Sequence, residues 1–218
     1  MSGARTPLLQ HAIRAMDHPV SRAISFRRSV RKFTSDPVDS RLIDEIIALA
    51  CLAPAPHHSR PWRFVNVATE DARESLADAM ADSWRADLDA EGRTVHEIAS
   101  LLEKSRLQVT DPPVVLLACI TLDEARPWPD ERRRAAERDM FVQSLGAALQ
   151  NILLAAEERG LAGYLKGAPL FCADALKEAL SLPAGWEPTF LVLLGRPDPS
   201  FLPSRREEVA LAKFMVKR

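Results

Sequence analysis

The chain has little of the chemistry that assigns a protein class at once. Its 218 residues include three cysteines, an odd number, and these lie in separate apolar stretches (Cys51, Cys119 and Cys172). This usage is typical of reduced core thiols in a cytosolic protein and excludes a disulfide framework or a cysteine-based metal site. The N-terminal residues lack the sustained apolar core of a signal peptide, so we expect a cytoplasmic protein.

Charge and hydropathy point to no extended partner. The 29 basic and 30 acidic residues nearly cancel, so neither nucleic acid nor an anionic membrane is expected. The longest unbroken apolar run, Val114–Ile120, is far shorter than the ~20 residues that a membrane span needs. Hydrophobic residues make up 47% of the chain and charged residues 27%. This is an ordinary globular composition, and we expect a single domain over residues 1–218.

The sequence also lacks the short motifs of self-sufficient catalytic sites. It has no G-x-S-x-G elbow and no H-E-x-x-H or C-x-x-C metal motif, and its carboxylates are spread over the expected helix surfaces. The remaining polar candidates are cations and backbone groups. This set favours the binding of a phosphorylated, redox-active cofactor that does the chemistry itself.

One long stretch, residues 138–163, organises the rest of the chain. Its apolar residues alternate with Ser, Gly and Ala, which predicts a long helix buried on most of its sides. Gly160 is placed to end this helix in a left-handed conformation. The simpler interpretation is a core helix. The further one is that the helix also lies at a subunit interface and presents a turn at Gly160–Gly163 to a cofactor.

The other periodicities predict an α+β fold, with a modest sheet covered by helices. Short apolar or alternating runs predict strands at about 63–68, 114–120, 164–166 and 189–194. Amphipathic patterns predict helices at 20–26, from an N-cap at Asp39 to residue 49, and at 71–88, 94–108 and 173–180. The charged tail, 201–218, is easier to place on a partner than in the core of a monomer.

A basic segment after the first predicted helix is one candidate site. Arg27, Arg28 and Arg31 flank Ser29, and forked guanidinium donors with a hydroxyl and free backbone N–H groups match the oxygens of a phosphate. A solvated basic face explains the same residues equally well.

A proline-stiffened loop, residues 53–61, is the second candidate. It carries His57, His58 and Arg60 directly before a predicted strand, where binding residues are often positioned. Adjacent histidines do not easily turn to one tetrahedral metal, and no further ligand motif completes a zinc site. The histidines can act as acids or donors near neutral pH. A purely structural loop is the alternative.

The glycine-punctuated stretch 160–167 is the third candidate. It follows a helix and precedes a strand, which is the wrong order for a dinucleotide fingerprint, and it lacks the ending of a P-loop. Helix termination explains Gly160 but leaves Gly163 unexplained. Glycines at this place let backbone approach a flat ligand.

Several motifs together resemble FMN-dependent nitroreductase-fold proteins. The run RRSVRKF and the loop APAPHHSRPWRFV carry this resemblance near the start of the chain. Within the superfamily, the chain is most similar to the C-terminal flavin domain of the bifunctional enzyme that completes coenzyme F-420 biosynthesis. This likeness continues through MADSWRADLDAEGR, WPDERRRAAERDMF and LSLPAGWEPTFLVLLGRP, and it extends from about Arg22 to Pro197.

The resemblance implies an intertwined homodimer with a central mixed sheet and two FMN sites at the interface. In the family, the basic segment serves the FMN phosphate and pyrimidine edge, a tail arginine serves the phosphate, and the backbone of a turn faces flavin N5. The matching positions here are Arg27, Arg28, Ser29, Arg31, Arg205, Gly163 and Tyr164. Because a reduced flavin holds negative charge near N1 and C2–O, a nearby arginine stabilises it.

The loop departs from typical nitroreductases, which read A-P-S-x-x-N-x-Q-P-W. Its three polar positions are here Ala55, His58 and Arg60, which resembles the coenzyme F-420 subfamily. The resemblance implies reduction of the double bond of dehydro coenzyme F-420, a phosphorylated deazaflavin. His57, His58 and Arg60 are then expected to grip its phosphate and carboxylate, with a histidine or water as proton donor. No stretch resembles the subfamily's ligase domain, so glutamate ligation is not expected. Two alternatives stay open: a generic NAD(P)H-dependent nitro- or quinone reductase, and a non-catalytic ligand-binding dimer.

Overall fold

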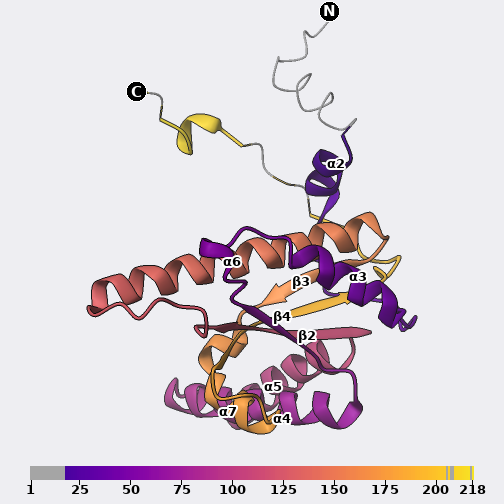
Figure 1. Ribbon diagram of the computed structural model, residues 1–218. Coiled ribbons are helices and arrows are strands. Elements are labelled where there is room, and N and C mark those ends of the chain that lie inside the picture. Colours follow the sequence, from indigo (N-terminus) through magenta and orange to yellow (C-terminus); the bar gives the residue numbers. More distant parts are fainter. Residues whose placement is uncertain (1–17, 205, 207–208, 217) are drawn as a thin grey trace, which may run out of the picture.

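The middle layer of the molecule is a four-stranded sheet in the order β1-β2-β4-β3. The computed structural model describes residues 18–204, 206, 209–216 and 218. The strands are β1 (Trp62–Asn66), β2 (Val114–Thr121), β3 (Ala162–Lys166) and β4 (Trp186–Gly195). Helices cover both faces of the sheet (Figure 1), which confirms the predicted α+β class.

The neighbouring strands all pair antiparallel, so the sheet is less mixed than we expected. Two consecutive helices, α4 (Glu70–Ala90) and α5 (Val95–Thr110), join β1 to β2. This helix pair returns the chain to the end of the sheet where β1 stopped, so β2 runs the opposite way. One helix, α6 (Glu131–Glu158), joins β2 to β3, and these two strands are parallel but separated by β4. A direct parallel contact is an isolated bridge between Ser29 and Gly163.

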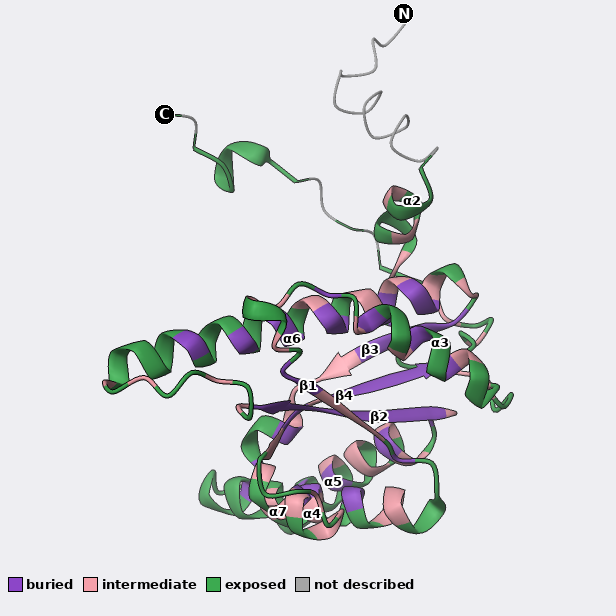
Figure 2. Cartoon of the chain, in the orientation of Figure 1, coloured by how far each residue is buried: buried purple, intermediate pink, exposed green. Residues whose placement is uncertain are grey.

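The two faces of the sheet have separate cores (Figure 2). Strand β2 is buried along its whole length, and its side chains alternate between the faces. Leu116 and Ile120 pack with α6 and α3 (Ser40–Ala50), whereas Leu117 packs on the other side with α4 and α7 (Ala173–Ala179). The shorter helices are α2 (Pro19–Phe26), η1 (Pro56–His58), η2 (Ala168–Phe171) and η3 (Leu211–Lys213).

Side-chain caps fix where several helices begin. The predicted cap at Asp39 is present, because its side chain accepts a hydrogen bond from the Arg41 N–H. Helix α6 begins earlier than the predicted residue 138, because the Asp130 side chain accepts from the Arg133 N–H. The exposed first turns of α6 carry no apolar period that marks them as helical. At its other end, Gly160 has φ +70°, which confirms the predicted left-handed stop.

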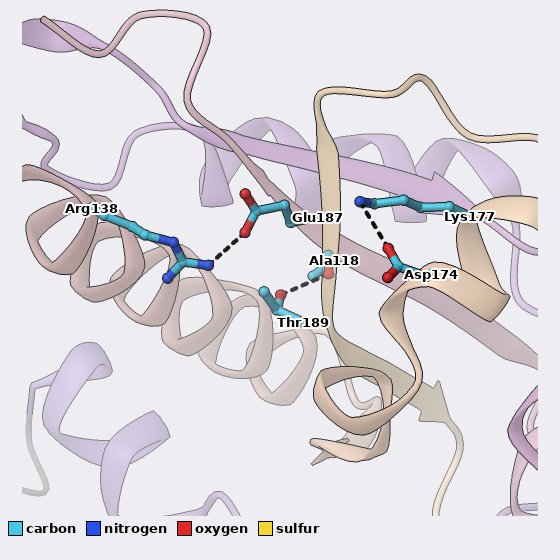
Figure 3. A network of polar contacts seen from close by, with 6 residues as sticks. All are labelled: Ala118, Arg138, Asp174, Lys177, Glu187 and Thr189. Carbon is cyan, nitrogen blue, oxygen red and sulfur yellow. Dashed lines mark hydrogen bonds and ion pairs between the residues drawn. The ribbon is translucent and has the colours of Figure 1, made fainter. Parts of the chain in front are cut away.

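A side-chain hydrogen bond bridges two strands at a bulge in the sheet (Figure 3). The register of β2 against β4 shifts between Ala118 and Cys119, and the Thr189 hydroxyl donates to the Ala118 carbonyl at 2.8 Å. Nearby, the Arg138 guanidinium of α6 lies 2.5 Å from the Glu187 carboxylate at the start of β4. These contacts fasten α6 and the central strands together.

The tail after β4 runs away from the sheet on the side of α2 (Figure 1). Large apolar side chains are exposed on both segments, such as Phe26 at 50% and Phe214 at 76%. In the part of the chain that the structure describes, no helix has the length and apolar character of a membrane span. The same residues contain no cluster of three or more His, Cys, Asp and Glu side chains that a metal ion needs.

Candidate functional site

The predicted basic segment lies along the beginning of β3. Ser29 is bridged to Gly163, and the Val30 N–H donates to the Gly163 carbonyl at 3.2 Å. A Cβ atom at Gly163 would collide with the Leu193 carbonyl and the Leu194 side chain of β4. Close backbone approach therefore explains this glycine. Gly163 lies within the strand and not in the predicted turn, because β3 already begins at Ala162.

Three guanidinium groups gather where α2 ends. Arg28 donates through Nη1 to the carbonyls of Ser25 (2.8 Å) and Arg27 (3.1 Å), which are carbonyls left free at a helix C-terminus. Arg206 donates to the Ile24 carbonyl at 3.1 Å and to the Arg27 carbonyl. The arginine cluster is thus formed by Arg27, Arg28 and Arg206, from two segments far apart in the sequence.

The arginine cluster has positive charge and a hydrogen-bond donor available for a ligand. Burial, with repulsion from Arg28 and Arg27, lowers the pKa of Arg206. Burial raises the pKa of the Glu157 carboxyl at the end of α6, although Arg27 and Arg28 act against this shift. The Arg28 Nε is buried and has no hydrogen-bond partner among the described residues. A buried donor without a partner fits an anionic ligand at this place.

The predicted tail arginine, Arg205, lies outside the described residues, so its role stays a prediction. The next residue, Arg206, reaches the cluster. Arg206 was not predicted as a site residue from the sequence. The run of two arginines in the tail was the available signal, and it does not say which of the two turns toward α2.

Arg31 is a further positively charged side chain, and it lies near the middle of β3. Its guanidinium lies 5.2 Å from the centroid of the Tyr164 ring, a cation–π contact. Tyr164 is buried, and its hydroxyl donates to the Gln108 carbonyl of α5 at 3.3 Å. Burial raises the pKa of Tyr164 to about 12, so the phenol stays protonated at neutral pH and positions Arg31.

A cavity of about 880 Å³ opens at the other end of β3, between α4, α5 and η2. This volume lies within the ~300–1,000 Å³ of small-molecule sites. Trp84, Lys104 and Lys166 are among its lining residues. The Lys166 Nζ donates to the Ser105 hydroxyl and the Gln108 side-chain carbonyl, both at 2.9 Å. Burial lowers the pKa of Lys166 to about 8.

Strand β3 joins the arginine cluster to this cavity. Gly163 lies beside the basic segment and Lys166 lies in the cavity wall. At ~3.3 Å per residue, these positions are about 10 Å apart along the strand. Arg27, Arg28 and Arg206 are not among the residues that line the cavity, so the strand is the link between the two features.

The predicted loop site lies elsewhere in the chain, on α6. His57, His58 and Arg60 all have left-handed backbones, with φ of 54°, 58° and 45°. Such conformations cost on the order of 1–3 kcal/mol each in residues other than glycine and cluster at functional sites. The Ser59 hydroxyl is buried without a hydrogen-bond partner among the described residues. Between residues 18 and 204, no hydrogen bond or ion pair joins this loop to the segment 27–31.

An arginine outside the loop holds one of its histidines. The Arg126 Nη2 lies 3.2 Å from the His57 Nδ1. Because a guanidinium only donates, this nitrogen accepts, and the proton of the neutral ring is on Nε2. Arg126 and Arg133 both lie near the Trp128 ring, at 5.9 Å and 4.9 Å from its centroid. This group was not expected from the sequence, because Arg126 is 69 positions from His57.

Comparisons with known proteins agree with the fold. The chain is 28% identical over 174 residues to a 5,6-dimethylbenzimidazole synthase of Rhodospirillum rubrum, covering 79% of each chain. A BluB-like flavoprotein from Clostridium difficile superposes with a TM-score of 0.75 at 22% identity, over 91% of this chain and 99% of that one. The NADPH:FMN oxidoreductase of Vibrio harveyi, solved with NAD⁺, gives 0.67 at 22% identity, over 92% and 78%. The family model described as the nitroreductase family matches residues 24–196, and the chain belongs to this family.

Proposed function

We propose that the chain is an FMN-dependent oxidoreductase whose cofactor lies along β3. The arginine cluster would hold the phosphate, and the cavity would hold the isoalloxazine ring. The observation that carries this proposal is the buried, unpartnered Arg28 Nε beside two further guanidiniums, joined by one strand to a cavity of about 880 Å³. Charge-assisted bonds from arginine to phosphate are among the strongest in proteins.

The bound FMN would supply the hydride, from N5 of its ring. The chain's own residues orient the ring and stabilise its charge. Arg31, which lies over the Tyr164 ring, would meet the pyrimidine edge. Gly163 lets β4 approach β3 closely, and Ser29 is bridged to the same glycine. The predicted access of flavin N5 to the backbone at Gly163 and Tyr164 remains part of the proposal.

A homodimer completes the site in this proposal. Within one chain, the loop with His57, His58 and Arg60 packs on α6, while the segment 27–31 contacts β3. A second copy can bring its own loop to the cofactor of the first. The exposed apolar residues of α2 and the tail, such as Val20, Phe26 and Phe214, fit burial in such an interface. Mass measurement in solution tests this, and a monomer that binds FMN fully would contradict it.

As substrate we propose dehydro coenzyme F-420. The polar loop supports it, because His58 and the cationic Arg60 stand where typical nitroreductases have uncharged amides, and Arg126 adds a further charge. His57, with its proton on Nε2, is suited to donate to a substrate phosphate or carboxylate. Hydride transfer further requires the two flat rings to approach within roughly 3–3.5 Å.

A generic NAD(P)H-dependent nitro- or quinone reductase is the second candidate. It shares the proposed FMN site, and the Vibrio harveyi NADPH:FMN oxidoreductase has the same fold. The non-catalytic alternative is disfavoured by membership of the nitroreductase family. Protein that stays colourless after FMN addition would revive it.

Mass spectrometry decides between the two substrates. The protein is incubated with FMN, a chemical reductant and dehydro coenzyme F-420, in parallel with NADPH and a nitroarene. A gain of two hydrogens by the deazaflavin, with slow NADPH oxidation, supports the first proposal. Fast NADPH oxidation with nitroarenes and an unchanged deazaflavin would replace it by the second.

A further inference from the structure

Lys166 is a cation that forms no direct ion pair with an acidic residue in the described part of the chain. Its two partners, the Ser105 hydroxyl and the Gln108 amide oxygen, are both neutral and both lie on α5. Among the residues that the structure describes, no carboxylate forms an ion pair with Lys166, although Lys177 and Arg106 both have one. A half-buried ammonium without a counter-charge is unfavourable. The site is therefore suited to an anion.

The ammonium also keeps a donor for a ligand. A lysine has three N–H groups, and two of them are used at 2.9 Å. Ser105 and Gln108 are three residues apart on one helix, so they share a face and hold the ammonium in one place. Two aromatic residues also line this cavity, Trp84 from α4 and Phe171 from η2. Cation and aromatic walls together suit a flat conjugated ring with an anionic edge.

We infer that Lys166 is a cofactor-contacting residue that stabilises the anionic, reduced form of the flavin ring. This inference rests on the proposed function, because the ring in the cavity is taken to be that of FMN. Oxidised flavin is neutral in its ring and reduced flavin carries charge at N1. A fixed ammonium therefore favours the reduced form and raises the reduction potential.

Other charged groups share the cavity and must be separated from Lys166. Asp87 and Glu91 line it from α4, Lys104 from α5, and Cys172 from the start of α7. Burial raises the pKa of the Cys172 thiol, so this group stays neutral near pH 7. Arg31 lies over Tyr164, two residues before Lys166 in β3. Lys166 differs from an arginine because it loses its charge as the pH rises past about 8.

The test measures the reduction potential of bound FMN in Lys166→Met, Lys166→Arg and Lys177→Met. Lys177 is the matched control, because it pairs with the exposed Asp174 outside the cavity (Figure 3). At pH 7 we expect Lys166→Met to bind reduced FMN at least tenfold more weakly relative to oxidised FMN. For a two-electron couple this lowers the potential by about 30 mV. Lys166→Arg and Lys177→Met should stay within threefold of the parent protein.

The pH dependence gives a second reading of the same variants. Between pH 7 and pH 10 the difference in reduction potential between the parent protein and Lys166→Met should become smaller, because Lys166 itself becomes neutral. The difference in reduction potential between Lys166→Arg and Lys166→Met should remain over the same pH range. Circular dichroism and bound-FMN absorbance confirm that each variant is folded and loaded.

Two outcomes would overturn the inference. One is an unchanged potential in folded, FMN-loaded Lys166→Met, including the case where only the KM for substrate rises, because the ammonium would then serve the substrate. The other is an equal change in Lys177→Met, which would make the effect one of general charge. If the parent protein does not bind FMN at all, the proposed function fails first, and this is seen in the initial titration.

Discussion

The two ends of β3 hold their cations in opposite ways. At its beginning, Arg28 and Arg206 rest on backbone carbonyls of α2, and their charge is permanent. At its end, Lys166 rests on a hydroxyl and an amide, and its charge depends on pH because burial lowers its pKa to about 8. A permanent charge suits a phosphate, which is always anionic. An adjustable charge suits a ring that changes its own charge during turnover.

We expect the largest effect when one of the permanently charged arginines is replaced by a neutral residue. Arg27→Ala should weaken FMN binding by about 1.5–3 kcal/mol, the scale of a lost charge-assisted hydrogen bond, or roughly ten- to hundredfold in Kd. Fluorescence titration with FMN measures this. Arg22→Ala is the control, because the Arg22 guanidinium lies over the Phe26 ring, 5.6 Å from its centroid, and pairs with no carboxylate among the described residues. Equal losses in both variants would place Arg27 outside the site.

Filling the space that Gly163 leaves between β3 and β4 should come next in size. Gly163→Ala puts a Cβ against the Leu193 carbonyl and the Leu194 side chain, and overpacking of this kind typically costs about 1–3 kcal/mol. Gly146→Ala is the matched control: its Cβ meets no atom within 4 Å, and in a helix it should stabilise by about 0.5–1 kcal/mol. Urea unfolding of both variants measures the difference. A Gly163→Ala protein as stable as the parent would show that the close approach is not needed.

The pH-dependent charge of Lys166 should change the free energy of unfolding even without a ligand. In the folded chain Lys166 loses its proton near pH 8, and in the unfolded chain near the ordinary value of about 10.4. The unfolded chain binds more protons between these values, so the stability of the parent rises relative to Lys166→Met as the pH increases from 8 to 10.5. After allowance for solvent screening we expect a rise on the order of 1–2 kcal/mol. Chemical unfolding at pH 7 and pH 10.5 measures it, and a flat difference would contradict the burial of Lys166.

The strained loop should give the smallest effect, and of opposite sign. His58 has φ 58°, a region in which glycine costs little. His58→Gly should therefore stabilise the fold by about 0.5–1 kcal/mol while weakening substrate binding. The control His96→Gly, in the first turn of α5, should instead destabilise slightly, because glycine has a lower helix propensity. If both variants destabilise equally in thermal unfolding, the loop stores no strain.

Local features of this molecule were readable from the sequence. Asp39 as a helix cap, Gly160 as a left-handed stop and the buried strand at Val114–Thr121 all follow from neighbouring residues. The boundary of α6 was placed late, because its first turns are polar and exposed and only the Asp130 cap marks them.

The candidate site was readable only where its residues are close in sequence. The segment 27–31 was singled out, but its contact with Gly163 is made across the sheet. Lys166 with Ser105 and Gln108, and Arg206 with Arg27, join positions 58 to 179 residues apart. Such pairings depend on the strand order and on which face of α5 is turned inward. A single sequence does not contain that information.

The most direct test of the account compares FMN with riboflavin, which has the same ring but no phosphate. If the arginine cluster holds a phosphate and the cavity holds the ring, the parent protein should bind FMN at least tenfold more tightly than riboflavin. Arg27→Ala should bind the two nearly equally. Equal affinities in the parent protein, or an FMN preference that survives Arg27→Ala unchanged, would contradict the placement of the cofactor along β3.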